Sequence, residues 1–340
     1  MRAVVLENEF GLANLAIRER DVPRPGPHQV LVKVAAVSLN YRDVLLVEGV
    51  YNPRHKLPVV PVSDMAGVVE AVGSEVTSVP PGDRVLNVFM EKWPAGKPSS
   101  QALSAGRGGP GGDGVLAEYA LFPEESLLAM PAHLSFEEAS TLPCAGLTAW
   151  AAVAEHGELR PGSTVVVEGT GGVALFALQF AKLAGARVLV LSSSDQKLEW
   201  IKDLGADEAV NYAETPDWWR AVRDRLSPEG ADLVIELGGA QTLENALRAV
   251  RPGGIVSLIG VLSGAHAPLN LPLVVMRQVR LQGITCGSRA DMVRMMAAVE
   301  THGLTPWIHE TVPFGNYVDA FELMKSSGHV GKIVVKVADL

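Results

Sequence analysis

Cysteine and long apolar runs are both scarce in this chain. Its 340 residues include two cysteines, Cys144 and Cys286, which lie far apart in the sequence. Two thiols in a chain of this length are typical of a reducing compartment, so we expect no disulfide framework. The most apolar region, residues 173–191, is interrupted by Lys182 and Arg187. No segment reaches the roughly 18 unbroken apolar residues that a membrane helix needs.

A signal peptide and an excess of basic charge are also missing. The apolar stretch at the N-terminus is cut off by Glu7 and Glu9, which is not typical of a signal peptide. We therefore expect a cytoplasmic protein without a membrane partner. The formal net charge of −9 disfavours nucleic acid as a partner, because nucleic-acid binding draws on basic surface.

The chain has enough apolar material for about two domains, since 48% of its residues are hydrophobic and 20% are charged. Its first third contains short β-branched or alternating runs, at residues 2–6, 30–37, 67–72 and 83–87. Proline and glycine separate these runs, which predicts a β-rich, barrel-like domain.

Residues 91–114 break this pattern. Segments 94–100 and 107–114 consist mainly of glycine, proline and small polar residues, and we expect them not to pack a core. Loops of this length are usually functional lids or surface loops without order. The sequence leaves both interpretations open.

Strands and helices alternate after Ser135, which begins a capping box with Glu138. The expected strands cover residues 164–168, 187–191, 208–211, 233–237, 255–259 and 279–285. Six strands with intervening helices predict a doubly wound parallel sheet. The remaining residues, 292–340, return to mixed helix and strand.

A glycine-rich turn follows the first of these strands, with the sequence Gly169-Thr170-Gly171-Gly172-Val173-Ala174. Gly169 allows a tight exit from the strand, Gly171 lets backbone approach a pyrophosphate, and Ala174 permits close packing of helix on strand. The amides at the start of the following helix favour phosphate binding. Because the unit over residues 164–191 is close to the roughly 30 residues of a strand–helix–strand crossover, the turn predicts a dinucleotide site.

The end of the second strand indicates which dinucleotide binds. In an NAD-specific site an acidic residue about 20 positions on binds the ribose 2′-hydroxyl, and this chain has Ser192 there. A serine removes the carboxylate that would repel a 2′-phosphate, and Lys197 can bind that phosphate. Asp195 lies three residues later and is interpreted as a helix cap. The sequence therefore favours NADPH over NADH.

Several further segments, taken in order, resemble one enzyme family. They are residues 1–5, 37–43, 66–73, 81–85, the glycine turn, 204–207 and 331–334. Together they resemble the medium-chain dehydrogenase/reductase superfamily, in its zinc-free quinone oxidoreductase (zeta-crystallin-like) branch. The resemblance implies an α/β protein in which a GroES-like β-barrel catalytic domain, over residues 1–144 and 284–340, is interrupted by a Rossmann dinucleotide-binding domain, over residues 145–283.

The resemblance also implies that the catalytic zinc of other members is absent. Those members carry a cysteine ligand at the position of Asn40, a Gly-His-Glu motif at 62–64, where this chain has Ser63 at the histidine position, and a cysteine ligand at Cys144. Only Cys144 keeps a sulfur or imidazole side chain, whereas a catalytic zinc site needs about three protein ligands. The four cysteines of a structural zinc lobe are missing from residues 91–114 as well. We expect no metal.

Without zinc, another group must stabilise negative charge on a substrate oxygen. The resemblance points to Asn40, which can donate an amide hydrogen bond, and to Tyr51, which matches a tyrosine implicated in proton donation by related enoyl reductases. Alternatives remain open: Asn40 as a turn residue and Tyr51 as an ordinary residue at the edge of the core. Tyr41 and Arg42 are expected to line the substrate pocket, with Asp43 orienting Arg42 or capping a helix.

Positions around the cofactor are implied in the same way. They are Thr148 beside the nicotinamide; Ser193, Lys197 and Tyr212 around the 2′-phosphate; Leu237, Gly260 and Val261 on the side of the nicotinamide ribose; and Ser288 and Arg289 near the pyrophosphate or the mouth of the substrate pocket. An alternative for Arg289 is a solvated surface charge. Cys144 is interpreted as structural.

These features predict transfer of a hydride from NADPH to a small-molecule acceptor, a quinone or the β-carbon of an α,β-unsaturated carbonyl, in a dry cleft between domains. Tyr51 or solvent would supply the proton that completes enoyl reduction. One alternative is a dehydrogenase of simple alcohols, and another is a cofactor-binding protein without a major catalytic role. Residues 271–285 look able to pair edge to edge, so a homodimer or homotetramer is expected.

Overall fold

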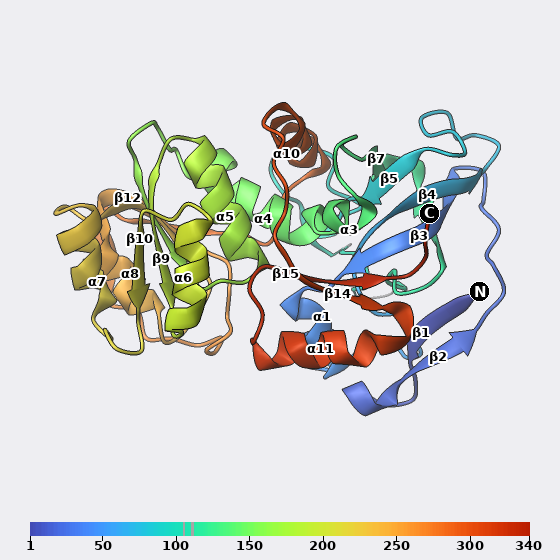
Figure 1. Ribbon diagram of the computed structural model, residues 1–340, viewed down its shortest axis with the longest axis horizontal. Coiled ribbons are helices and arrows are strands. Elements are labelled where there is room, and N and C mark those ends of the chain that lie inside the picture. The colour runs from blue at the N-terminus through green and yellow to red at the C-terminus, as the bar shows by residue number, and fades with distance from the viewer. Residues whose placement is uncertain (105, 110–111) are drawn as a thin grey trace. The chain divides into compact units, whose positions relative to one another are not determined.

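The computed structural model describes residues 1–104, 106–109 and 112–340 (Figure 1). Two compact units are present. Unit 1 comprises Met1–Leu147 and Cys286–Leu340, and unit 2 comprises Thr148–Thr285. The chain thus leaves unit 1 and returns to it within three residues of the positions expected from the sequence.

Unit 1 is built on a mainly antiparallel sheet with the order β14-β15-β3-β4-β5-β7, in which β6 also pairs with β3. A separate two-stranded sheet joins β1 to β2. The strands are β1 (Arg2–Leu6), β2 (Leu15–Glu19), β3 (Gln29–Ser38), β4 (Asp64–Val72), β5 (Arg84–Asn87), β6 (Tyr119–Pro123), β7 (Leu127–Ala129), β14 (Ile308–Pro313) and β15 (Lys332–Lys336). Their valine-rich inner faces form one apolar core, as strands half-buried in a barrel require.

The C-terminal segment completes this sheet. Strand β15 pairs antiparallel with β3, with Val334 opposite Ser38 and Val335 opposite Val37. The helices of unit 1 are α1 (Tyr41–Val47), α2 (Ser100–Leu103), α3 (Phe136–Ala139), α10 (Arg289–Thr301) and α11 (Tyr317–Ser326). The expected capping box of Ser135 and Glu138 is present at α3. Because β15 belongs to the sheet, residues more than 290 positions apart in the sequence become neighbours.

Unit 2 contains the predicted parallel sheet of six strands. They are β8 (Thr164–Glu168), β9 (Arg187–Ser192), β10 (Glu208–Asn211), β11 (Ala231–Glu236), β12 (Val250–Leu258) and β13 (Arg280–Gly283), in the order β10-β9-β8-β11-β12-β13. All five pairings are parallel. The order reverses between β8 and β11, which is the position where doubly wound sheets bind ligands. The prediction of a doubly wound sheet is confirmed.

Helices cover both faces of this sheet (Figure 1). The helices of unit 2 are α5 (Gly172–Leu183), α6 (Asp195–Asp203), α7 (Trp218–Ala221), α8 (Leu243–Ala249) and α9 (Leu271–Val275), and α4 (Leu147–Trp150) begins in unit 1 and ends in unit 2. Alternate strand residues such as Val166, Leu189 and Val234 pack with Trp218 and Leu247 from α7 and α8. Both faces of a strand are buried here, which explains its near-continuous apolar sequence. Among the helices of the described residues, none is long and apolar enough to span a membrane.

Candidate functional site

The glycine turn lies where strand β8 passes into helix α5. Gly169 follows the strand with a φ of 82°, a left-handed conformation that glycine adopts without strain. Gly171 precedes the helix and provides no side-chain cap, so the first amides of α5 keep no partner within the helix. These amides and the positive end of the helix dipole form an anion-binding position. The structure thus brings Gly169, Thr170, Gly171, Gly172 and Val173 together as predicted.

The residues assigned to the 2′-phosphate gather at the end of β9. Ser192 is the last residue of that strand, and its carbonyl accepts a hydrogen bond from the amide of Tyr212 (3.0 Å). Ser193 is exposed beside it. Lys197 lies in the first turn of α6, where burial lowers the pKa of its ammonium group. A hydroxyl, rather than a carboxylate, therefore stands at the end of β9.

The interpretation of Asp195 as a helix cap is wrong. Ser194 caps α6, because its hydroxyl accepts the amide of Lys197 (3.4 Å). Asp195 is instead the first residue of the helix, and its carboxylate accepts a hydrogen bond from the Asn211 side chain (2.9 Å). The capping motif was read one residue too late, because serine and aspartate both suit that position.

The residues expected near the nicotinamide ribose follow two adjacent strands. Leu237 comes after β11 and Gly260 after β12, and both Ile259 and Gly260 donate their amides to the carbonyl of Glu236 (3.0 and 3.2 Å). A Cβ atom on Gly260 would lie 1.8 Å from the Leu237 carbonyl oxygen, so this contact requires glycine. Val261 is exposed next to it. The structure brings these predicted positions together.

Three other predicted cofactor residues belong to other segments of the chain. Thr148 is buried in α4 at the start of unit 2. Ser288 caps α10 in unit 1 through Asp291, and Arg289 donates to the Glu125 carbonyl (2.8 Å). Arg289 is therefore not a fully solvated surface charge. Its contact with the pyrophosphate remains a prediction, as do those of Ser288 and Thr148.

A buried polar cluster in unit 1 surrounds the predicted residue Asn40. Its amide nitrogen donates to Asp64 (3.0 Å), and its amide oxygen accepts from the Lys332 ammonium group (2.7 Å). The cluster forms because Asn40 follows β3, Asp64 begins β4 and Lys332 begins β15, which are adjacent strands. Asn40 also caps the start of helix α1, and its backbone amide donates to the Asp43 carboxylate (2.8 Å). It is thus a turn residue whose side chain still has a second amide hydrogen.

Asp64 is the central acceptor of this cluster. It accepts hydrogen bonds from the Ser63 hydroxyl (2.6 Å) and from the Cys144 amide (3.0 Å), besides that of Asn40. Burial raises the pKa of Asp64 to about 6, although Lys332 and the two side-chain hydrogen bonds oppose the rise. Asp64 is therefore ionised at neutral pH and carries the negative charge that Lys332 balances.

Lys332 was missed as a site residue. It is 2% exposed, and burial lowers the pKa of its ammonium group. Besides Asn40 it donates to the Leu39 carbonyl (2.5 Å). The sequence feature that could have identified Lys332 is its place as the first residue of the apolar strand β15. A charged residue in a buried strand needs a polar partner, so a partner could have been expected. The hydrogen-bond partners of Lys332 are separated from it by more than 290 positions.

The two cysteines meet in this region. The thiols of Cys144 and Cys286 are hydrogen-bonded, and this contact raises the pKa of Cys144, with further contributions from burial and from Asp64. Cys286 also contacts the Pro143 carbonyl (3.7 Å). Both cysteines are free thiols.

Arg42 and Tyr51 form a stacked pair. The Arg42 guanidinium lies 4.7 Å from the Tyr51 ring centroid and 5.4 Å from that of Phe89. Asp43 orients Arg42 (2.9 Å) and also bonds the amide of Asn40, so both roles suggested for Asp43 are present. Tyr51 is 44% exposed, with its ring placed by a cation–π contact. The remaining pocket candidate, Tyr41, packs partly against the apolar core of unit 1.

Two arginines anchor the segment between residues 91 and 114. Arg42 donates to the carbonyls of Arg107 and Gly108 (3.2 and 3.1 Å). Arg107 is partly buried, pairs with Glu91 (3.1 Å) and lies over the ring of Phe122 (4.3 Å). The expectation that parts of this segment do not pack is therefore wrong for 107–109, since Gly108 and Gly109 are buried. Residues 105, 110 and 111 lie outside the described residues.

A metal does not fit the polar cluster. Within residues 1–104, 106–109 and 112–340, no three His, Cys, Asp or Glu side chains are placed to hold a metal ion. Asp64 and Cys144 offer two such groups, and the Lys332 ammonium lies where it interacts with both. A buried cation at this position opposes the binding of a second one.

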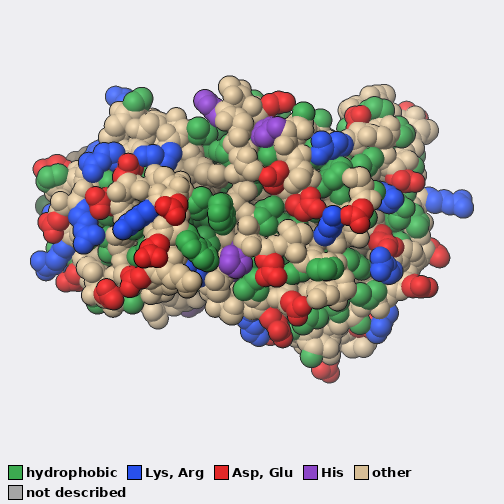
Figure 2. Space-filling model, in the orientation of Figure 1, with side chains coloured by type: hydrophobic (Ala, Val, Ile, Leu, Met, Phe, Trp, Pro, Cys, Tyr) green, Lys and Arg blue, Asp and Glu red, His purple; other side chains and the backbone are tan. Residues whose placement is uncertain are grey.

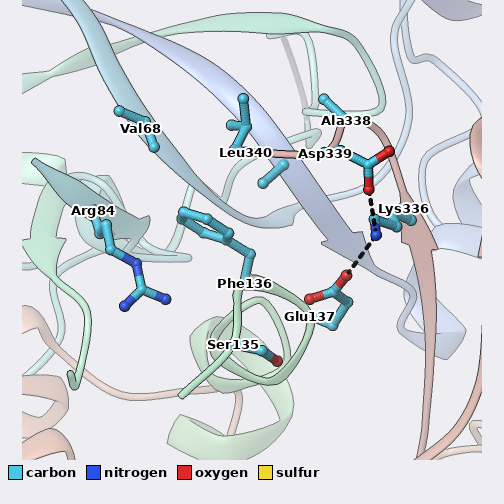
Figure 3. A pocket seen from close by; sticks show the side chains of 10 residues that line it. Val68, Arg84, Ser135, Phe136, Glu137, Lys336, Ala338, Asp339 and Leu340 are labelled. Atoms are coloured by element: carbon cyan, nitrogen blue, oxygen red, sulfur yellow. Dashed lines mark ion pairs between the residues drawn. The ribbon is translucent and has the colours of Figure 1, made fainter. Parts of the chain in front are cut away.

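A separate hollow of about 490 Å³ lies on unit 1 between α3 and the C-terminal residues (Figure 3). Lys336 projects into it and pairs with Glu137 (3.8 Å) and Asp339 (2.6 Å). Lys336 is thus already engaged by two acids, and none of the predicted site residues lines the hollow. Acidic and basic side chains are also interspersed on the face drawn in Figure 2.

Two family models match the chain. Residues 26–132 match the alcohol dehydrogenase GroES-like domain, and residues 172–301 match the zinc-binding dehydrogenase domain. A zinc-type alcohol dehydrogenase-like protein of Schizosaccharomyces pombe is 39% identical over 345 residues, with 99% of each chain covered. A quinone oxidoreductase of Lama guanicoe is 28% identical (98% and 97% covered), and an acryloyl-coenzyme A reductase of Metallosphaera sedula is 28% identical (98% and 99% covered).

Solved structures agree with this assignment. A Sinorhizobium meliloti 1021 protein whose name carries the words alcohol dehydrogenase has a TM-score of 0.93 at 41% identity, with 99% of this chain and 98% of that chain covered. A mycobacterial protein in complex with NADPH has a TM-score of 0.83 at 26% identity, with 99% and 100% covered. The two units therefore define a Rossmann-containing oxidoreductase. The chain belongs to the medium-chain dehydrogenase/reductase superfamily.

Proposed function

We propose that this protein transfers a hydride from NADPH to a quinone or an α,β-unsaturated carbonyl, without zinc. The observation that carries the proposal is the cluster around Asn40, whose side chain is held by Asp64 and Lys332 at a position that carries a cysteine ligand in the zinc-containing members that the chain resembles. Such a site can donate hydrogen bonds to a developing oxyanion, and its residues do not make up the set of about three ligands that a catalytic zinc needs.

The residues of unit 2 fit a dinucleotide. Gly169 has the positive φ that the turn needs, and the uncapped start of α5 offers amides to phosphate groups. Ser192 and Lys197 would hold the 2′-phosphate, because they supply a hydroxyl and a cation where an acid would repel it. The bound NADPH supplies a hydride at C4 of its nicotinamide. A relative that binds NADPH supports this choice.

The residues of unit 1 would act on the acceptor. Asn40 is held by Lys332 and Asp64, so its second amide hydrogen has a fixed direction and can bind a carbonyl or quinone oxygen. Tyr51 carries a hydroxyl that can deliver the proton, and Arg42 positions its ring. Since the Arg42 guanidinium also bonds the carbonyls of Arg107 and Gly108, the 91–114 segment and Tyr51 share one anchor.

A steady-state assay of purified protein tests the proposal. We expect NADPH oxidation with at least one class in a panel of quinones, enals and enoyl thioesters, a higher kcat/KM for NADPH than for NADH, and less than one-tenth equivalent of zinc by elemental analysis. Replacing Tyr51 by Phe should lower enoyl reduction far more than NADPH affinity. Stoichiometric zinc together with turnover of simple alcohols would instead support the alcohol dehydrogenase alternative, which the names of two relatives favour. Tight NADPH binding with no turnover on the panel would support a binding role.

We also propose that unit 2 mediates a homodimer through strand β13. This strand ends the six-stranded sheet, and Leu271, Val275 and Met276 nearby are 60%, 69% and 81% exposed. An unpaired sheet edge beside exposed apolar side chains favours association of two copies. Light scattering of the purified protein would measure its mass directly.

A further inference from the structure

Two buried glutamates lie side by side next to the glycine turn. Glu168 ends strand β8 and Glu236 ends strand β11, and these strands pair in parallel with Ile235 opposite Val167. Glu168 is 5% exposed and Glu236 is fully buried. The groups that donate to these two acids are backbone amides and one hydroxyl group, not basic side chains. Buried acids of this kind need hydrogen bonds or a shared proton.

Both carboxyl groups bind the loop that follows β11. Glu168 Oε2 accepts the amides of Leu237 and Gly238 (3.2 Å each). Glu236 Oε1 accepts the amides of Gly238 (3.0 Å) and Gly239 (2.9 Å), and also the hydroxyl of Thr242. The loop over residues 237–242 is therefore held from both sides by the pair. Leu237 is the residue that contacts Gly260, so the pair also supports that position.

One oxygen of the pair receives no donor. Glu168 Oε1 is buried without a hydrogen-bond partner, whereas its carboxyl group contacts that of Glu236. Two carboxyl groups attract each other only when one of them carries a proton. Burial, followed by the charge of Glu236, raises the pKa of Glu168 well above its usual range. Glu236 accepts from three donor groups, the amides of Gly238 and Gly239 and the hydroxyl of Thr242.

We propose that Glu168 and Glu236 share one proton and act as positioning residues that hold the loop 237–242 in the conformation required for dinucleotide binding. The proposal rests on the proposed function, because the loop matters only if a dinucleotide binds here. When the proton is lost, two anions face each other in a buried site, and repulsion displaces the loop. The amides of Leu237 and Gly238 then lose their positions, and cofactor affinity falls.

The sign of the pH effect follows from the raised pKa. The ordered loop is fully populated at low pH and is lost as the pH rises through the pKa of Glu168 in the folded protein. Glu236 from β11 is the titratable group whose charge acts on Glu168; the other groups facing it are the amides of Leu237 and Gly238. From α8 and from the segment after β12, the loop meets the uncharged side chains of Thr242 and Ser263. Lys197 is a second group near the cofactor site with a lowered pKa, and the test must separate the two.

Binding of NADPH and of NADH to the full-length protein, measured by fluorescence titration from pH 7 to pH 10, separates them. Loss of the shared proton weakens both dinucleotides alike, by tenfold or more, whereas loss of the Lys197 proton weakens NADPH alone because NADH has no 2′-phosphate. Glu168→Gln keeps the acceptor oxygen and places an amide donor toward Glu236. It should bind within twofold of the parent at pH 7 and show no alkaline loss for NADH.

Two controls and a cofactor-free measurement complete the test. Glu229→Gln makes the same change at an exposed site of unit 2 and should follow the parent at every pH. Glu236→Gln removes acceptor capacity and should weaken both dinucleotides at least tenfold already at pH 7. An NADH affinity that stays constant to pH 10 in the parent, or a Glu168→Gln variant as weak as Glu236→Gln at pH 7, would overturn the proposal.

The thermal midpoint of the cofactor-free protein tells whether the positioning role of Glu168 and Glu236 is wrong or whether the proposed function is wrong. It should fall between pH 7 and pH 10 in the parent and fall less in Glu168→Gln. If the midpoints behave in this way but no dinucleotide binds at any pH, the acid pair stands as a structural feature, and both its positioning role and the proposed function are wrong. If dinucleotides bind but neither midpoint nor affinity depends on Glu168, the positioning role alone is wrong.

Discussion

Replacing Lys332 by Met tests the polar cluster around Asn40. Methionine matches the length of lysine but removes the ammonium group, so Asp64 loses its counter-charge while remaining buried. Asp64 can respond by taking up a proton. The free energy of unfolding of the variant should therefore depend on pH in a way that the parent does not.

The pKa of Asp64 sets how much free energy of unfolding the Lys332→Met variant loses at each pH. In the parent this pKa is about 6, above the value of 3.8 for a free aspartate. A raised pKa stabilises the fold at low pH, and the contribution is lost as the pH rises through about 6. Without Lys332 the pKa rises further, so that Asp64 stays protonated in the folded variant. The loss relative to the parent is then close to zero at pH 5, about 1.4 kcal/mol at pH 7 and about 2.7 kcal/mol at pH 8.

Hydrogen bonds add a loss that does not depend on pH. Lys332 donates to Leu39 and Asn40, and two unsatisfied buried acceptors cost on the order of 2–4 kcal/mol together. Urea unfolding of the full chain at pH 5 and pH 8 would separate the two contributions. Asp64→Asn in the same background should abolish the pH-dependent part, because no carboxylate remains to titrate.

Lys336→Met is the matched control, since Lys336 lies on the same strand but is half-exposed and pairs with surface acids. It should lose less than about 1 kcal/mol at either pH, as exposed ion pairs do. If the loss caused by Lys332→Met is equal at pH 5 and pH 8, then Lys332 does not balance the charge of Asp64, and the reasoning is refuted.

Three further predictions concern unit 2. Ser192→Asp should place a carboxylate at the 2′-position and shift the ratio of kcat/KM from NADPH toward NADH by at least tenfold, about 1.4 kcal/mol; an unchanged ratio would contradict the role of Ser192. Gly169→Ala should lower the free energy of unfolding by about 1–2 kcal/mol, because a φ of 82° is strained for alanine, and it should also weaken NADPH binding. Gly205→Ala is the control: its φ of 98° lies outside the turn, so this variant should lose stability but keep its affinity for NADPH. Met276→Lys should convert a dimer into a monomer in light scattering if β13 forms the interface; a dimer that persists would place the interface elsewhere.

Local features of the dinucleotide unit could be predicted because they are contiguous in sequence. The glycine turn and Ser192 belong to one strand–helix–strand unit, and their spacing alone places the turn at the end of a buried strand. The alternation of apolar strands and helices predicted the six parallel strands for the same reason. Single-residue assignments were less secure, as the exchange of Asp195 for Ser194 as the cap of α6 shows.

The functional groups of the polar cluster depended on tertiary structure. Lys332 and Asp64 begin two strands and Asn40 follows a third, and the pairing of these strands follows no local pattern. Their hydrogen bonds exist only after β15 has joined β3. Each residue alone resembles an ordinary polar residue near a strand end.

The glutamate pair and the thiol contact follow the same rule. Glu168 closes one strand and Glu236 another, and the sequence places 67 residues between them. Cys144 and Cys286 are farther apart still, yet their thiols touch. The sequence by itself determined where strands, helices and the dinucleotide turn occur, since these depend on backbone preferences and periodicity within about 30 residues. Which buried charges face one another was decided only by the tertiary structure, because that depends on the order and register of strands far apart in the chain.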